Sequence, residues 1–119
     1  MSTIIPTRVP VEKHASVALV TTWAALANGD DGAPVELSFL SDRSVQVVGT
    51  FGVGGNVLIE GSNNGVDYAT LTDPQGNTLS LASGRIESVM EVVRFIRPRV
   101  TAGDGTTSLT VTLLMVGSV

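Results

Sequence analysis

Few residues of this chain have side chains that commonly do chemistry, and their spacing favours turns over a reactive site. The 119 residues include one histidine, His14, and no cysteine, so we expect neither a catalytic triad nor a histidine or cysteine metal site. The segments 30–32 (DDG) and 63–67 (NNGVD) bring oxygen ligands together, but without the spacing of a calcium loop, and tight turns select the same residue types. The glycines of 52–55 lack the helix and lysine of a phosphate-binding loop. We predict no catalytic residue, no metal and no cofactor, and therefore no enzyme.

The late arginines are the charged residues with the best placement for contacting a partner. Arg97 and Arg99 are two positions apart in a predicted strand, so both point to one face together with Phe95. Arginine beside an aromatic residue is a common interface pairing. We predict that Phe95, Arg97 and Arg99 contact an acidic partner or a neighbouring subunit. The alternative is an exposed sheet face with salt bridges to Glu87 or Glu91.

Two further charges lie close to these residues in the predicted sheet. Arg94 is expected to face the other way, together with Ile96. Glu60 is a single acid in an otherwise apolar strand and could pair with one of the late arginines. No second acid lies near Glu60 in the sequence to suggest the carboxylate pair of a glycosidase.

The composition indicates a small protein that covers part of its surface with other protein. Hydrophobic residues make up 43% of the chain and charged residues 15%, against about 25% charged residues in typical domains. The net charge is −4, and the four late arginines have Glu87 and Glu91 among them, which argues against a nucleic-acid partner. No apolar run is long enough to span a membrane, and the first residues do not resemble a signal peptide. We therefore expect a protein made in a cytoplasm that covers part of its surface with partner protein.

Residues 1–15 are predicted to form an extended N-terminal arm, and residues 16–119 a single domain. Two prolines hold the arm extended, while its apolar residues give it something to bury. Such an arm often lies across a neighbouring subunit; the alternative is a frayed terminus. The predicted contact residues in the arm are Ile4, Ile5, Pro6, Arg8, Val9 and Pro10.

The rest of the chain alternates between apolar and polar residues with the period of β-strands. Val45–Thr72 reads as three strands of an antiparallel meander joined by two glycine-rich turns. Ser108–Val116 alternates almost throughout, and 101–107 reads as the hairpin loop before it. Ile86–Val93 also fits helical spacing, but its β-branched neighbours favour a strand. The predicted fold is all-β: an antiparallel, jelly-roll-like sandwich of about eight strands.

Two segments resemble small structural proteins of tailed bacteriophages. They are DRSVQVVGTFGVGGNVLIEGSNNGVDYATLTDPQG and RFIRPRVTAGDGTTSLTVTLLM, within the last two thirds of the chain. An Ile-Glu-Gly-Ser-Asn-Asn-Gly hairpin, a Leu-Thr-Asp turn and an Arg-Phe-Ile-Arg-Pro strand are similar to those of phage head proteins encoded near the capsid gene. Similar hairpins occur in carbohydrate-binding modules.

This resemblance implies a capsid decoration, or cement, protein of the virion. Such a protein binds the outer surface of the assembled head as a homodimer or homotrimer and bridges subunits of the major capsid protein. The alternative is a carbohydrate-binding or structural module of a phage tail or baseplate. A carbohydrate-binding module would need exposed aromatic rings, and the chain offers Trp23, Phe39, Phe51, Tyr68 and Phe95.

Overall fold

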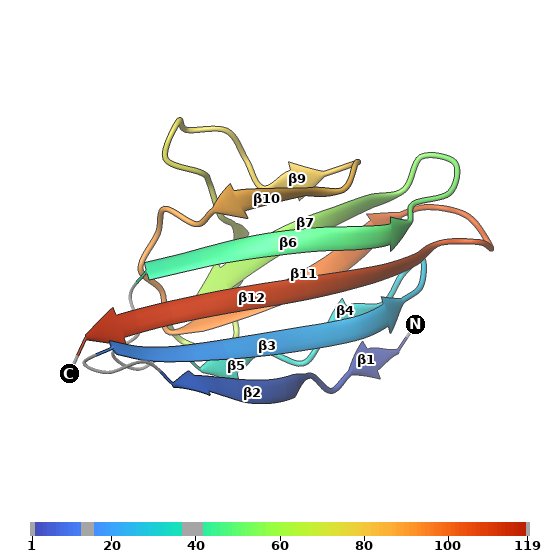
Figure 1. Ribbon diagram of the computed structural model, residues 1–119. Coiled ribbons are helices and arrows are strands. Elements are labelled where there is room, and N and C mark those ends of the chain that lie inside the picture. The colour runs from blue at the N-terminus through green and yellow to red at the C-terminus, as the bar shows by residue number, and fades with distance from the viewer. Residues whose placement is uncertain (1, 13–15, 37–41, 119) are drawn as a thin grey trace.

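The protein is a sandwich of two β-sheets, as the alternation of the sequence predicts (Figure 1). The computed structural model describes residues 2–12, 16–36 and 42–118. One sheet has five strands in the order β10 (Arg85–Ser88), β6 (Asp42–Thr50), β12 (Ser108–Ser118), β3 (Ser16–Leu26) and β2 (Thr7–Glu12). The other has seven, many of them short: β1 (Thr3–Ile4), β4 (Asp31–Gly32), β11 (Phe95–Ala102), β7 (Asn56–Ser62) and β8 (Ala69–Thr70) in order, with β5 (Val35–Glu36) beside β11 and β9 (Ser80–Leu81) beside β7.

The core lies between the sheets and is built from alternate residues of the long strands. Val45 and Val47 of β6 and Leu113 of β12 are at most 1% exposed, and their neighbours in sequence point outward, because side chains alternate along a strand. Trp23 is the largest buried side chain; its indole Nε1 donates to the Ala33 carbonyl oxygen at 2.9 Å. This bond ties the five-stranded sheet to the segment after β4.

Paired strands cross from one sheet to the other at one end of the sandwich. The connections β3 to β4, β6 to β7 and β11 to β12 all lie there in Figure 1. β6 pairs with β12 in one sheet, and their continuations β7 and β11 pair in the other. The first turn of the predicted meander, at 51–55, and the predicted hairpin at 101–107 are therefore corners between sheets. The second turn of the meander is confirmed, because it joins the antiparallel pair β7 and β8.

Side chains from one corner hold the backbone of the other. The Asp104 carboxylate accepts from the Val53 backbone N–H at 2.8 Å, and the Thr107 hydroxyl donates to the Phe51 carbonyl oxygen at 2.7 Å. Gly52 has φ of 73° and lies so close to Asp104 that a Cβ would be 2.2 Å from the carboxylate oxygen. A hairpin would leave these groups apart, so the long-range bonds explain why the chain turns a corner.

The N-terminal segment, predicted to be an arm, pairs with both sheets of its own chain. Thr3 and Ile4 form β1, which runs parallel to β4, and residues 7–12 form the edge strand β2 beside β3. Ile5 and Pro6 lie at the crossing between the sheets. Ile4 packs against the core, whereas Ile5 is 76% exposed.

The ambiguous segment Ile86–Val93 is strand only over its first part. β10 ends at Ser88, and no helix forms among the described residues. Irregular structure follows until β11 begins at Phe95. Val89 is buried and its N–H donates to the Arg43 carbonyl oxygen at 3.1 Å, which holds this segment against the first residues of β6.

The close approach of β4 to Trp23 makes a first prediction. A Cβ on Gly32 would lie 2.6 Å from Pro98 Cδ and from two atoms of the Trp23 indole, so Gly32→Ala should destabilise the fold by about 1–3 kcal/mol through overpacking. Gly105→Ala is the matched control, since a Cβ there meets nothing within 4 Å, and it should change stability by less than about 0.5 kcal/mol. Urea unfolding followed by Trp23 fluorescence measures both; equal effects would contradict the packing described.

Acid should weaken the corner that Asp104 holds. The hydrogen bonds from the Thr106 side chain and the Val53 backbone lower the pKa of Asp104 from 3.8 to about 2. Because the pKa is lower in the folded state, the carboxylate stabilises the fold above about pH 4, and this contribution is lost as the pH falls toward about 2. The difference in Tm between wild type and Asp104→Asn should therefore be largest above about pH 4 and shrink toward pH 2.

The matched control for this measurement is Asp67→Asn. It removes a carboxylate that accepts from the Asn64 side chain within a single exposed loop and does not join the two corners. Its Tm should stay near that of wild type at neutral pH. A constant difference between wild type and Asp104→Asn across the whole range would exclude the proposed ionic role of Asp104.

Candidate functional site

A lattice of charged side chains covers the outer face of the seven-stranded sheet. β11 pairs with β7 so that Arg97 lies opposite Glu60 and Arg99 lies opposite Leu58. The residues on either side of this pair in the strand, Ile96 and Val100, point into the core. Strand alternation thus places both arginines and the acid on one face, next to one another.

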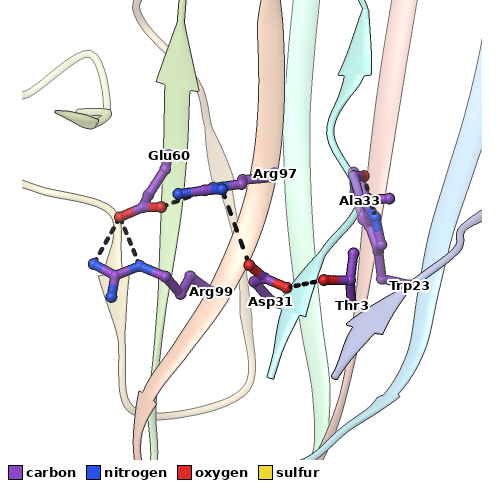
Figure 2. A network of polar contacts seen from close by, with 7 residues as sticks. All are labelled: Thr3, Trp23, Asp31, Ala33, Glu60, Arg97 and Arg99. Carbon is purple, nitrogen blue, oxygen red and sulfur yellow. Dashed lines mark hydrogen bonds and ion pairs between the residues drawn. The ribbon is translucent and has the colours of Figure 1, made fainter. Parts of the chain in front are cut away.

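Glu60 is the centre of this lattice. Its side chain is 5% exposed and receives Arg97 Nε on Oε1 at 3.1 Å and Arg99 Nη2 on Oε2 at 2.9 Å (Figure 2). Arg97 Nη1 also lies 4.0 Å from Asp31 Oδ2, and Asp31 accepts from the Thr3 hydroxyl at 2.7 Å. The chain of contacts therefore runs from β7 across β11 and β4 to β1.

Aromatic rings extend the lattice at its margin. The Arg97 guanidinium lies 3.8 Å from the centroid of the Tyr68 ring, and Arg94 lies 4.9 Å from the centroid of Phe95. Arg94 also forms an ion pair with Glu36 at 2.7 Å, and both side chains are more than half exposed. Stacking of this kind favours guanidinium over ammonium groups, which fits the use of arginine at positions 94 and 97.

The lattice is electrically balanced. Two arginines face two acids, and the hydrogen bond to Glu60 raises the pKa of Arg99 above its usual value. Both carboxylate oxygens of Glu60 are engaged by arginine. Such an arrangement fixes the surface of the sheet and presents planar donors at its rim, but its acid has no free oxygen for proton transfer.

The structure confirms the predicted placement of the late strand residues relative to one another. Phe95, Arg97 and Arg99 share one face, and Glu60 pairs with two of them. Arg94 does not face the opposite way: it precedes β11 and stacks on Phe95.

The alternative salt bridges to the later acids are wrong. Glu87 pairs with Arg85 at 3.0 Å. Glu91 accepts from the Thr72 backbone N–H at 2.8 Å and from the Thr72 hydroxyl. The arginines find acids on neighbouring strands, because the sheet register places those acids closer than the acids next to them in sequence.

The N-terminal residues of the predicted contact surface are not brought to the charged lattice. Ile5, Arg8 and Val9 are exposed, and Val9 lies on the outer face of the other sheet, opposite Val20. The structure thus divides the predicted contact residues between the two faces. The remaining members are Ile4, against the core, Pro6, partly buried, and Pro10, within β2. His14 and Phe39 lie outside the described residues.

A second polar cluster was not foreseen from the sequence. Arg43 is 6% exposed and donates to the Glu91 carbonyl oxygen, while the Glu91 carboxylate binds Thr72. Burial lowers the pKa of the Arg43 guanidinium, against the raising effect of Asp42 and Glu91. Its neighbours in the sequence, Asp42 and Ser44, are polar and gave no sign of this burial.

The turns rich in Asp and Asn serve their own backbone. Asn64 Oδ1 accepts from the N–H groups of Val66 and Asp67 at 2.9 Å, and Asp30 accepts from Ala27 N–H at 2.9 Å. Across the described ranges, no three His, Cys, Asp or Glu side chains gather closely enough to hold a metal ion. Within the same ranges, no helix is long and apolar enough to cross a membrane.

The aromatic side chains do not form an open platform for sugars. Trp23 is fully buried, and Phe51 and Phe95 are partly buried. Tyr68 is partly buried and its ring is occupied by Arg97. Stacking on a sugar ring requires a free aromatic face. Together these four residues do not present such a surface.

The fold is similar to that of a solved protein of matching size. The SPBc2 prophage-derived protein YomS superposes with a TM-score of 0.67 at 12% identity, over 90% of this chain and 99% of that one. No protein-family model and no curated protein matches the sequence. A pilus subunit of Bacillus endospore appendages (15% identity, 96% and 90% covered) and NMB1881 of Neisseria meningitidis (12%, 95% and 83% covered) give TM-scores of only 0.42 and 0.41.

The buried position of Glu60 leads to a stability prediction. Glu60→Gln leaves Arg97 and Arg99 without their shared acid, and should lower the free energy of unfolding by about 1–3 kcal/mol, less than for a fully buried pair because both arginines reach solvent. Arg94→Gln is the control: its pair with Glu36 is exposed, so the loss should stay below about 1 kcal/mol. Urea denaturation compares the two variants. An unchanged free energy of unfolding for Glu60→Gln would show that the lattice does not stabilise the sheet.

Proposed function

We propose that this chain is a structural protein of a bacteriophage particle that binds the outer surface of the capsid and stabilises it by bridging major capsid protein subunits. The observation that carries the proposal is the end-to-end similarity of fold to a prophage-derived protein of nearly the same length. The resemblance of segments 42–76 and 94–115 to phage head proteins points the same way. The protein would be made in the host cytoplasm and act on the virion.

The surface chemistry supports an architectural role. The most organised polar site is a lattice in which acids and arginines form ion pairs with one another. Such a lattice makes the sheet more rigid, as a structural role in a particle requires. Few charges elsewhere leave large areas that can be covered by protein at a small desolvation cost. Stabilisation of a shell would follow from mass action, since a ligand that binds only the assembled form shifts the equilibrium toward it at every site.

The N-terminal crossing supplies a contact point for the capsid. Ile5 is 76% exposed between β1 and β2, where the chain passes from one sheet to the other. An aliphatic side chain held out on a fixed crossing between two strands has little conformational entropy left to lose on binding. The alternative role in a tail or baseplate, with a sugar ligand, gains no support from the aromatic residues described above.

The test is binding to heads of the phage, or induced prophage, whose genome carries this coding sequence. The purified protein should co-sediment with expanded heads at saturating stoichiometry and raise the temperature at which they release DNA. Ile5→Glu should weaken co-sedimentation at least tenfold, because it places a charge at the contact, while leaving the Tm of the free protein unchanged.

The matched control is Val53→Glu, at another exposed aliphatic residue, 82% exposed, in the corner between β6 and β7. It should bind heads as wild type does. If Ile5→Glu binds as tightly as the control, the crossing does not contact the capsid. If the wild-type protein ignores heads altogether, the proposed function is refuted, and a glycan array and tail particles become the next targets.

A further inference from the structure

The outer face of the five-stranded sheet differs in chemistry from the charged lattice on the other side. The sheet register aligns Val9, Val20, Leu114 and Ser44 in one row across β2, β3, β12 and β6. Val9 is 58% exposed and Leu114 37%. This row crosses the sheet that lies in front in Figure 1.

A second row runs beside the first and is also without charge. It holds Thr7, Thr22, Thr112, Gln46 and Ile86, from β2 through to β10. Ile86 is 61% exposed. These hydroxyl, amide and aliphatic side chains give a face that is uncharged and only moderately hydrophobic.

Charge is nearly absent from this face, which we call the neutral face and define by the outward residues of β10, β6, β12, β3 and β2. Among those whose side chains the structure describes, Asp42 at one end is the single charged residue. A hollow of about 200 Å³ opens beside it, lined by Arg43, Ser44, Leu114 and Val116 as well. The face therefore has a depression at one end, into which a side chain of a partner can insert.

We propose that a second copy of this chain covers the neutral face, sheet against sheet, around a twofold axis near the centre of β12. The inference does not require head binding, although the resemblance to capsid decoration proteins also implies a homodimer or homotrimer. Such an axis would set β12 of one copy against β12 of the other, because β12 is the middle strand with two strands on either side.

Electrostatics favour a second copy as the occupant. The chain carries a net charge of −4, so two copies repel one another unless they meet where charge is absent. The neutral face meets that condition without needing a complementary patch. On the opposite face, a second copy would have to desolvate Arg97 and Arg99, which already pair within the chain.

The area fits a dimer of ordinary size. Strands lie about 4.8 Å apart and rise about 3.4 Å per residue, so each residue covers about 16 Å² of a sheet face. Five strands of four to eleven residues then present on the order of 650 Å², within the usual range for one partner of a specific interface. Edge-to-edge extension is the competing mode, and Pro10 removes an amide donor from the edge strand β2.

Sedimentation velocity over a wide concentration range tests the proposal on the free protein. Wild type should sediment as a dimer of the 12.3 kDa chain. Leu114→Glu places two carboxylates in the contact and should raise the dimer dissociation constant on the order of 100-fold or more. Val66→Glu, in the exposed loop after β7 and 79% exposed, makes the same chemical change elsewhere and should leave the dimer intact.

A second variant protects the test against misfolding. Should Leu114→Glu lose its circular-dichroism spectrum, Gln46→Arg replaces it, since Gln46 is exposed on the neighbouring row and the change adds charge of the opposite sign. Monomeric wild type at every concentration would overturn the proposal. So would a trimer, or a folded Leu114→Glu or Gln46→Arg variant that dimerises as tightly as wild type.

Discussion

The two corners that Asp104 and Thr107 join determine how the rest of the chain is arranged. A pair of strands can fold over from one sheet to the other only if both members turn at the same level. Here the Asp104 carboxylate binds the Val53 backbone of the neighbouring corner, and Gly52 allows the close approach. The register of β6 with β12, and of β7 with β11, follows from this shared turning point, as does the core between the sheets.

That register also separates two kinds of surface. In β7 and β11 the outward positions carry Glu60, Arg97 and Arg99, which neutralise one another. In β12 the outward positions carry Thr112 and Leu114, which have no charge to neutralise. A sandwich with one self-satisfied face and one uncovered neutral face is suited to association through the second. In the proposed dimer the charged face would remain turned outward.

Features that depend on alternation along a single strand could be predicted from the sequence. Features that depend on contacts between distant residues could not. The strand period of 108–116 and the common face of Arg97 and Arg99 could be predicted because side chains alternate along any strand. The difference between a hairpin and a corner could not, since both are rich in glycine and only the bond from Asp104 to a distant backbone decides. The segment 1–15 reads as an arm for a related reason: an extended apolar segment has the same pattern whether it pairs with its own sheet or another subunit. The burial of Arg43 left no trace in its neighbours.

The division between the two faces can be measured directly, because the chain has no cysteine and a single one can be placed at will. A spin label on Thr112→Cys, at the centre of the neutral face, should report a distance between copies below roughly 25 Å, because packed sheets lie about 10 Å apart. A label on Thr70→Cys, on the charged face, should report a distance beyond roughly 30 Å, since at least three such layers separate the copies. A short distance at Thr70, or no dipolar coupling at Thr112, would contradict the account.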